Sequence, residues 1–421
     1  MKNNLSIDER SISIYFEKEF LQILDYDSTP PNGDCIKAIA LVRNKEGKPL
    51  PNVSVDILEK ENSYFGLVSI YHSDKEKLVE IKNISSGQKY FSITSDKNGE
   101  LIFYIYPKKS TSVIFQVDSM VLDITDRISS KNKVYIVDNN KEDLNLPPLV
   151  ISEDNSSLLV DPNSNVFNVL IQNYPGAKRN DTILFFINKQ YAQKLFFVQE
   201  VNKLGNDSYV IFPYNMFKVN ELANFSYTVV DKLRTVRSSY PQGIIYPGGG
   251  YNQPIDNLTR IYDSCIVYNS YGYHDDKNII YDTIHEKDVD NKCNNSHHEA
   301  LFVKIIGTSD YKDKTKVPLG AEVTLNLYVN NYPNTIYQSK VKIMPTQPDS
   351  DNSNTATLLF GIPFSYVSHI GNGDIYLDFQ VNYYGDISYG KIWQANVYTV
   401  RPGGEVTGDA CPDGKTWSGI C

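Results

Sequence analysis

The sequence lacks the patterns that mark helical, membrane-spanning or nucleic-acid-binding proteins. It has only 4 methionines and no long stretch rich in Ala, Leu, Glu and Lys, the residues that form helical bundles. No apolar run approaches the roughly 18 residues of a membrane-spanning helix. The net charge is −9 and no stripe of Lys and Arg stands out, whereas nucleic-acid binding rests on basic contacts to phosphates. We therefore expect no nucleic-acid partner and no membrane-spanning segment.

Catalytic signatures are also missing. The chain has no Gly-x-Ser-x-Gly nucleophile elbow, no Gly-x-x-x-x-Gly-Lys phosphate loop and no dinucleotide fingerprint. Gly248-Gly249-Gly250 follows a proline and is typical of a linker. We therefore expect a protein that is not an enzyme and that needs no cofactor.

The five cysteines indicate whether the protein works in an oxidising or a reducing compartment. Cys411 and Cys421 enclose a short polar loop with little core of its own, and a disulfide would supply the missing constraint. Cys265 and Cys293 bracket a second polar segment and are the natural second pair. Disulfides favour an extracellular or bacterial cell-surface location, although the start of the chain shows no signal peptide and leaves the export route open. The alternative is five reduced thiols in a cytosolic protein, and the partner of Cys35 stays open.

The abundant residues favour strands and turns. The 31 tyrosines suit pleated, half-buried surfaces, and the 20 prolines suit turns. Many short segments alternate apolar and polar residues and are separated by turn residues, the pattern of two-sheet sandwiches. At about 100–200 residues per domain, the length predicts two to four domains. The predicted fold class is all-β, with tandem β-sandwiches.

One pattern occurs twice. A strand ending at Asn173-Tyr174-Pro175 is followed later by Tyr246-Pro247-Gly248-Gly249, and Asn331-Tyr332-Pro333 is followed by Arg401-Pro402-Gly403-Gly404. A repeat of this length predicts two domains of the same construction. The expected strand matches are 167–171 with 323–329, 183–187 with 341–343, 209–213 with 358–363, and 225–231 with 377–383.

These patterns divide the chain into six parts. Residues 251–300 have no counterpart in the first repeat, and they are too long for a connection, which averages about 4–6 residues. The predicted parts are a lead-in over 1–30, a first β domain over 31–145, the first repeat over 146–250, a Tyr/His/Cys-containing insertion over 251–300, the second repeat over 301–404 and a C-terminal disulfide loop over 405–421.

The first domain carries two turn patterns, Gly47-Lys48-Pro49-Leu50-Pro51-Asn52-Val53 and Thr94-Ser95-Asp96-Lys97-Asn98-Gly99. Proline fixes φ and glycine supplies positive φ at such turns. The domain resembles the invasin/intimin-type bacterial immunoglobulin-like domain called Big-1. It departs from that pattern over residues 58–90, which are long and charged, so an inserted hairpin or loop is expected there.

The two repeats resemble the immunoglobulin-like modules of large, repetitive bacterial surface adhesins. The first repeat shows Asp181-Thr182-Ile183 and Tyr227-Thr228-Val229-Val230-Asp231, whereas the second has Phe379-Gln380-Val381-Asn382-Tyr383 at the latter place. The resemblance implies tandem immunoglobulin-like β-sandwiches in an elongated arrangement, used in adhesion or surface display.

Two aromatic features are candidate ligand or partner contacts. Tyrosine combines a large contact area with a polar tip, which suits recognition. The alternative is that the rings pack between domains and along strand edges. Trp417, in the predicted C-terminal disulfide loop, either contacts a partner or docks on the last sandwich. The candidate tyrosines are Tyr262, Tyr268, Tyr271 and Tyr273.

A group of histidines is the candidate metal site, with carboxylates nearby. Imidazole and carboxylate together suit Zn²⁺ or another divalent transition metal. The spacing matches no closed-site template, and the alternative is a solvated polar loop. The histidines are His274, His285, His297 and His298.

These features favour a non-enzymatic bacterial adhesin, or a surface or secreted binding protein. Its expected partner is a host or cell-surface protein or glycan, contacted through residues 240–300 and the C-terminal loop. The alternative is a structural or targeting subunit of a secreted assembly, such as a toxin complex or a phage-tail-like fibre.

Overall fold

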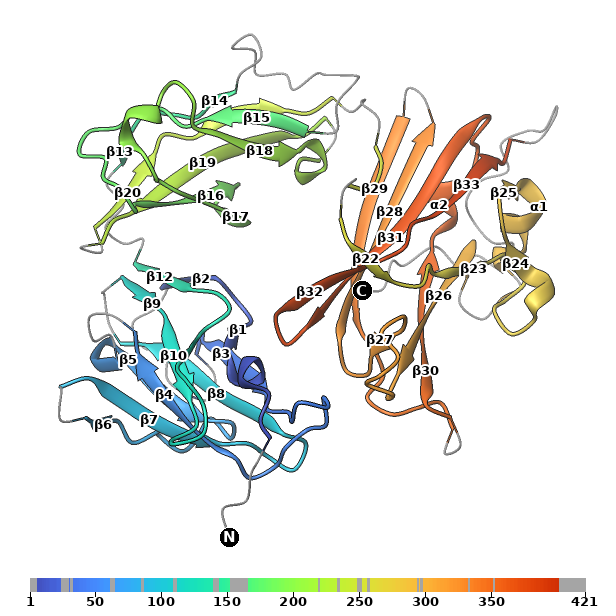
Figure 1. Cartoon of the computed structure of the whole chain (residues 1–421). Helices are drawn as coiled ribbons and strands as arrows, with labels where there is room; N and C mark the ends of the chain where they lie inside the picture. The colour runs from blue at the N-terminus through green and yellow to red at the C-terminus, as the bar shows by residue number, and fades with distance from the viewer. Residues whose placement is uncertain are drawn as a thin grey trace. The chain divides into compact units, whose positions relative to one another are not determined.

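The fold consists almost entirely of β-strands in two compact units. The computed structural model describes residues 6–23, 30, 33–60, 65–84, 87–108, 112–138, 144–151, 166–218, 220–232, 235–247, 252–255, 258–293, 295, 298–331, 334–350 and 353–400 (Figure 1). Of the described residues, those up to Tyr246 form the first unit and those from Pro247 form the second. The described α-helices are α1 (Glu286–Val289) and α2 (Phe364–Val367). The predicted all-β class is confirmed.

The first unit begins with a sandwich of short strands. One sheet has the order β1-β3-β8-β5, built from β1 (Tyr15–Phe16), β3 (Ile36–Leu41), β8 (Glu100–Pro107) and β5 (Val68–His72). A second has the order β11-β10-β4-β7-β6, built from β11 (Ile128–Ser129), β10 (Val117–Met120), β4 (Ser54–Glu59), β7 (Lys89–Thr94) and β6 (Lys82–Asn83). A third has the order β2-β12-β9, built from β2 (Phe20–Ile23), β12 (Val134–Asp138) and β9 (Val113–Phe115).

Two expectations for this sandwich change. Within the lead-in expected over residues 1–30, β1 pairs with β3, and β2 runs parallel to β12. These residues therefore form part of the first sandwich, because their alternating apolar side chains complete its core. Within residues 58–90, where an inserted hairpin or loop was expected, β5 and β6 extend one sheet each.

The second sandwich completes the first unit. One sheet has the order β13-β20-β19-β16-β17, with β21 also on β19; its strands are β13 (Leu144–Leu146), β20 (Val236–Ser239), β19 (Leu222–Val230), β16 (Thr182–Ile187), β17 (Gln190–Phe197) and β21 (Gln242–Ile245). The other is β14-β15-β18, with β14 (Val150–Ile151), β15 (Val166–Leu170) and β18 (Tyr209–Pro213). Alternation directs Phe167, Phe212 and Phe225 into the shared core, where each is at most 2% exposed.

The second unit is a sandwich with the same plan. One sheet has the order β22-β32-β31-β28-β29, with β33 on β31 and β25 on β33; its strands are β22 (Arg260–Tyr262), β32 (Asp386–Gly390), β31 (Gly373–Tyr383), β28 (Glu322–Asn331), β29 (Asn334–Ile343), β33 (Trp393–Tyr398) and β25 (Thr283–His285). The other is β24-β23-β26-β27, with β30 on β26; its strands are β24 (Ile279–Ile280), β23 (Ile266–Tyr268), β26 (Leu301–Thr308), β27 (Val317–Pro318) and β30 (Thr355–Ile362).

The pairings define an immunoglobulin-like topology in both repeats. The first and last strands are both split. β13 and β22 run parallel to β20 and β32, the first halves of the last strand, while β14 and β23 pair with the second strands β15 and β26. The second strand pairs with the fifth, β15 with β18 and β26 with β30. The third pairs with the sixth, β16 with β19 and β28 with β31. Strands A, B and E thus share one sheet and C, F and G the other. The predicted immunoglobulin-like sandwiches are confirmed.

The strand-by-strand match of the repeats is correct only in its second half. Asn173-Tyr174-Pro175 follows β15, the second strand, whereas Asn331 of the other copy is the last residue of β28, the third. The matches of 167–171 with 323–329 and of 183–187 with 341–343 are therefore displaced by one strand. An alternating strand followed by a turn has the same pattern wherever it lies in the sandwich. The last two matches join β18 with β30 and β19 with β31, which are structural equivalents.

Residues 251–300 are part of the last sandwich rather than an insertion outside it. They contain both halves of its first strand, β22 and β23, and also β24 and β25. Val267 and Ile284 lie in the core and are 0% exposed. Residues 269–300 separate β23 from β26, whereas residues 152–165 separate the corresponding β14 and β15 of the first repeat.

Within the first unit, an apolar cluster connects the two sandwiches. Phe20 of β2 packs edge-on against Phe186 of β16, with ring centroids 5.2 Å apart, and lies 5.3 Å from the ring of Tyr191 on β17. Tyr135 of β12 and Leu184 of β16 belong to the same cluster and are 1% and 0% exposed. Removing apolar surface from water stabilises the contact between the two sandwiches by about 25 cal/mol per Å².

Glu19 lies at the edge of this junction and should make its stability depend on pH. Burial raises the pKa of the Glu19 carboxyl, although its Oε2 accepts a hydrogen bond from the Tyr191 hydroxyl at 3.4 Å. Because the folded state binds the proton more tightly, stability falls as pH rises from the unfolded pKa through the raised folded value. Glu19→Gln should therefore melt above the wild type at pH 7 and at the same temperature near pH 4. A calorimetric pH series measures this, and a pH-independent difference would contradict it.

Candidate binding surface

The structure separates the four candidate tyrosines. Tyr262 and Tyr268 are 6% and 2% exposed. Tyr262 belongs to the core cluster, whereas Tyr268 follows the inward Val267 on β23 and is buried on the opposite face of that strand. Tyr262 stacks on Phe379 with ring centroids 6.4 Å apart. Burial raises the pKa of the Tyr262 and Tyr268 hydroxyls. Tyr271 is 60% exposed in a turn. Tyr262 and Tyr268 are thus both buried, and the expectation that they face a ligand is corrected.

The other aromatic candidates give little support to a shared recognition surface. Tyr273 is half-buried and packs against Phe302 and His274, with ring centroids 5.4 and 4.1 Å away. Trp417 lies outside the described residues, together with Cys411 and Cys421. Their predicted contact and disulfide stay predictions.

Cys265 is a free thiol in the core of the second unit, so the predicted bridge between Cys265 and Cys293 is not formed. It is 3% exposed, and burial raises the pKa of the thiol to about 12. Cys265 directly precedes β23, where the chain passes from one sheet to the other, and its small apolar side chain points into the core there. Spacing along a polar sequence could not reveal this orientation.

Three of the four candidate histidines lie in the described part of the chain. His274 is exposed before the 3-10 helix η6 (Asp276–Asn278), and His285 is exposed at the end of β25. His298 is half-buried at φ 55°, and its Nδ1 has no hydrogen-bond partner among the described residues. His297 lies outside them. Among the described residues, no three His, Cys, Asp or Glu side chains form a group that could hold a metal ion.

A buried polar network fixes the entry of the chain into the second unit. Arg260 Nη2 donates to Asp378 Oδ2 at 2.8 Å, and the two side chains are only 12% and 5% exposed. The other carboxylate oxygen accepts from Asn326 Nδ2 at 3.0 Å, and Tyr337 donates to Asn326 Oδ1 at 3.0 Å. Arg260 Nη1 also donates to the Gly390 carbonyl at 2.8 Å. The network joins β22, β29, β28, β31 and β32.

The segment before β22 is attached to the same face of the sheet. Asn252 N donates to Asn330 Oδ1 at 3.1 Å, and Asn330 Nδ2 donates back to the Asn252 carbonyl at 2.8 Å. Asn252 Nδ2 donates to the Ile336 carbonyl at 2.7 Å. Together with Arg260, these bonds hold the segment across the outer side of β28 and β31. Burial, and secondarily the Asp378 carboxylate, raise the pKa of Tyr337.

Beside this segment, three neighbouring strands present an open polar and aromatic surface. β25 runs parallel to β33, with Thr283 opposite Asn396, and β33 runs antiparallel to β31, with Asn396 opposite Asp374 (Figure 1). Ile284, Val397 and Ile375 point inward and are at most 1% exposed. The outward residues form what we call the tyrosine–amide face: Thr283, His285, Asp374, Tyr376, Gln394, Asn396 and Tyr398.

The tyrosine–amide face is accessible to a ligand. Gln394, Asn396 and Tyr398 are exposed, and the Tyr398 side chain is 50% exposed. Tyr376 and Asp374 are half-buried beside them. The alternation of Trp393-Gln394-Ala395-Asn396-Val397-Tyr398 marks this strand in the sequence, but the neighbouring strands could not be identified without the pairing.

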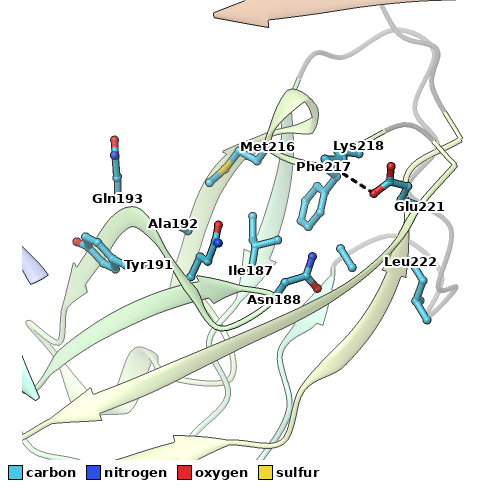
Figure 2. A pocket seen from close by; sticks show the side chains of 12 residues that line it. Ile187, Asn188, Tyr191, Ala192, Gln193, Met216, Phe217, Lys218, Glu221 and Leu222 are labelled. Carbon is cyan, nitrogen blue, oxygen red and sulfur yellow. Dashed lines mark ion pairs between the residues drawn. The ribbon is translucent and has the colours of Figure 1, made fainter. Parts of the chain in front are cut away.

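A pocket of about 490 Å³ lies in the second sandwich (Figure 2). Its wall includes Ile187, Tyr191 and Gln193 from β16 and β17, and Phe217 from the segment before β19. Lys218 and Glu221 at its edge form an ion pair of 3.5 Å and are 80% and 63% exposed. None of its lining residues is a serine, cysteine or histidine.

Comparisons with known proteins leave the family open. No family model matches the chain, and no curated protein matches it. Similar solved structures include the BSP domain of a biofilm-associated protein, with 10% identity, a TM-score of 0.20 and coverage of 92% of this chain and 96% of that one. Another is the Escherichia coli alpha-2-macroglobulin, with 11% identity, a TM-score of 0.20 and coverage of 94% and 23%. A third is the FN1–FN3 domains of chicken CNTN1, with 7% identity, a TM-score of 0.16 and coverage of 92% and 97%.

At these values the similarities carry no argument about function, and the immunoglobulin-like assignment rests on the strand pairings. The Big-1 type stays a prediction. Within the described ranges, no helix has the length and hydrophobicity needed to cross a bilayer.

The Arg260–Asp378 pair should be essential to the stability of the second unit. Asp378→Asn leaves the guanidinium buried without a counter-charge, which should cost about 3–5 kcal/mol of unfolding free energy. The matched control is Lys391→Ala, since Lys391 forms an exposed ion pair with Asp263 at 3.2 Å and should contribute only about 0–1 kcal/mol. Calorimetry of the full chain measures both changes. Equal melting of Asp378→Asn and the wild type would contradict the assignment.

Cys265 should be chemically silent until the second unit unfolds. A buried thiol with a raised pKa supplies little thiolate at pH 8, so iodoacetamide should label Cys265 only in denaturant. Peptide mass spectrometry without reduction gives the result directly. Recovery of a Cys265–Cys293 disulfide peptide would contradict the free thiol.

Proposed function

We propose that this protein is a non-enzymatic, immunoglobulin-like bacterial binding protein, displayed on the cell surface or secreted, that recognises a host or cell-surface partner. The observation that carries the proposal is the tyrosine–amide face of the second unit. Its outward residues on β25, β33 and β31 are those of a recognition surface, while the inward residues of the same strands form core.

The scaffold supports binding in a second respect. Recognition benefits when the contact residues need little ordering on association. Here they lie on paired strands, and the Arg260–Asp378 network ties the adjoining segment to the same sheet. A preorganised face of this kind suits a role as an adhesin or a secreted binding protein.

The alternative, a subunit of a secreted assembly, has one observation in its favour. β18 lies at the edge of its sheet and contains no charged residue. Its outward Tyr209 and Ile211 are 47% and 53% exposed. Uncharged, apolar edge strands are prone to pair with another chain.

Two surface variants of the full chain separate these functions. Labelled wild-type protein should bind a panel of epithelial and bacterial cells saturably, and unlabelled protein should compete. Asn396→Ala with Tyr398→Ala should weaken that binding by roughly tenfold to a hundredfold, because two contact residues are lost together. Tyr209→Ser with Ile211→Ser, the matched pair on β18, should bind as the wild type does.

Flow cytometry measures the binding, and thermal melting checks that both variants fold. No saturable binding to any cell, or equal binding by the face variant, would overturn the proposed site. Self-association that only the β18 variant abolishes would favour the assembly subunit.

A further inference from the structure

We propose that the tyrosine–amide face binds a neutral oligosaccharide. This inference rests on the proposed function and specifies the class of its partner. It follows from the chemistry of the outward groups, from their spacing, and from the charges that the face lacks.

The amides and hydroxyls match a ligand rich in hydroxyl groups. Gln394 and Asn396 each offer an acceptor oxygen and two donor hydrogens, and Thr283 offers one hydroxyl that can do both. Asn396 lies between Thr283 and Asp374 in the strand register, so a row of hydrogen-bonding side chains crosses the face. A sugar ring presents a hydroxyl, itself donor and acceptor, at most of its carbons. Each hydroxyl therefore finds a complementary group without requiring a charged partner.

Two tyrosines border this polar centre. Tyr376 pairs with Gln394, and Tyr398 is four residues beyond Gln394 on the same strand. At about 3.3 Å per residue, the two rings are attached roughly 13 Å apart along the strands. The C–H faces of sugar rings pack against aromatic rings, while the phenol tips reach the hydroxyls. An extended oligosaccharide, rather than a single sugar, would reach both rings.

The charges argue for a neutral ligand. Asp374 is the one carboxylate among the residues of the face, and none of them is lysine or arginine. His285 is its only other titratable group besides the tyrosines. Sialylated, sulfated or phosphorylated ligands would meet the Asp374 carboxylate without a fixed cation to offset the repulsion. The net charge of the chain, −9, also repels anionic ligands.

A protein partner fits the same surface less well. Protein interfaces are anchored by aromatic, Met and Arg side chains around an apolar centre. On β25 and β33 the aliphatic side chains of Ile284, Ala395 and Val397 all point inward. The centre of the face consists of amides and hydroxyls instead, which a hydroxyl-rich ligand pairs better than an apolar anchor does.

The first experiment applies the full chain to a microarray of neutral, sialylated and sulfated oligosaccharides. We expect binding to neutral members and weaker binding to their anionic counterparts.

Gln394→Ala, Asn396→Ala and Tyr398→Ala should each weaken binding to a neutral oligosaccharide found on the array on the order of tenfold, as measured by titration calorimetry. The controls are Gln338→Ala and Tyr311→Ala, exposed residues of the same unit outside the face, which should bind like the wild type. No glycan binding, preference for anionic members, or equal losses in the controls would overturn the inference.

The second experiment separates failure of this inference from failure of the proposed function. Cells that bind the protein are treated with periodate, which cleaves the vicinal diols of sugars, or with proteinase K. Loss of binding after periodate supports the oligosaccharide. Binding that depends on the face, resists periodate and is lost after proteinase K identifies a protein partner: the proposed function then stands and the oligosaccharide is excluded. Absence of saturable binding before any treatment overturns both.

Discussion

The buried ion pair between Arg260 and Asp378 is the interaction on which the second unit most depends. A carboxylate in the middle of a sheet strand is costly to bury without a counter-charge, and Arg260 satisfies it from the first strand of the domain. The same guanidinium binds the backbone of β32, so one side chain fixes the parallel pairing of β22 with β32. The segment before β22 is thereby held across the outer side of the sheet, and the remaining outer surface is left to β25, β33 and β31.

The division of each strand into an inner and an outer row accounts for both stability and function. In β33, Trp393, Ala395 and Val397 enter the core, and the three residues between and after them face outward. The inner row can vary only within the limits of packing, because interiors are closely filled. The outer row is free of that constraint. The outward residues of an immunoglobulin-like sandwich can therefore form a binding surface while its core stays unchanged. This independence explains how one fold can support many functions.

Local pattern was sufficient to predict the class of fold. Alternation and turn residues predicted sandwiches, and the matches of β18 with β30 and of β19 with β31 are correct because those strands alternate apolar and polar residues in the same way in both copies. The Asn-Tyr-Pro match failed because the same local pattern closes the second strand in one copy and the third in the other. Which strands become neighbours depends on long-range pairing that a local pattern does not encode. The side on which Tyr262, Tyr268 and Cys265 lie depends on the same pairing, so candidate contacts taken from composition alone were partly core.

The tyrosine–amide face could not be predicted for the same reason. Its residues come from β25 and, about a hundred positions later in the sequence, from β31 and β33, and only the register of these strands brings them together. Hydroxyl-radical footprinting of the full chain, free and bound to cells, tests its role most directly. We predict protection of Tyr398 and its neighbours on β33 upon binding, with Tyr209 on β18 unchanged. Protection of Tyr209 with no change at Tyr398 would contradict the account.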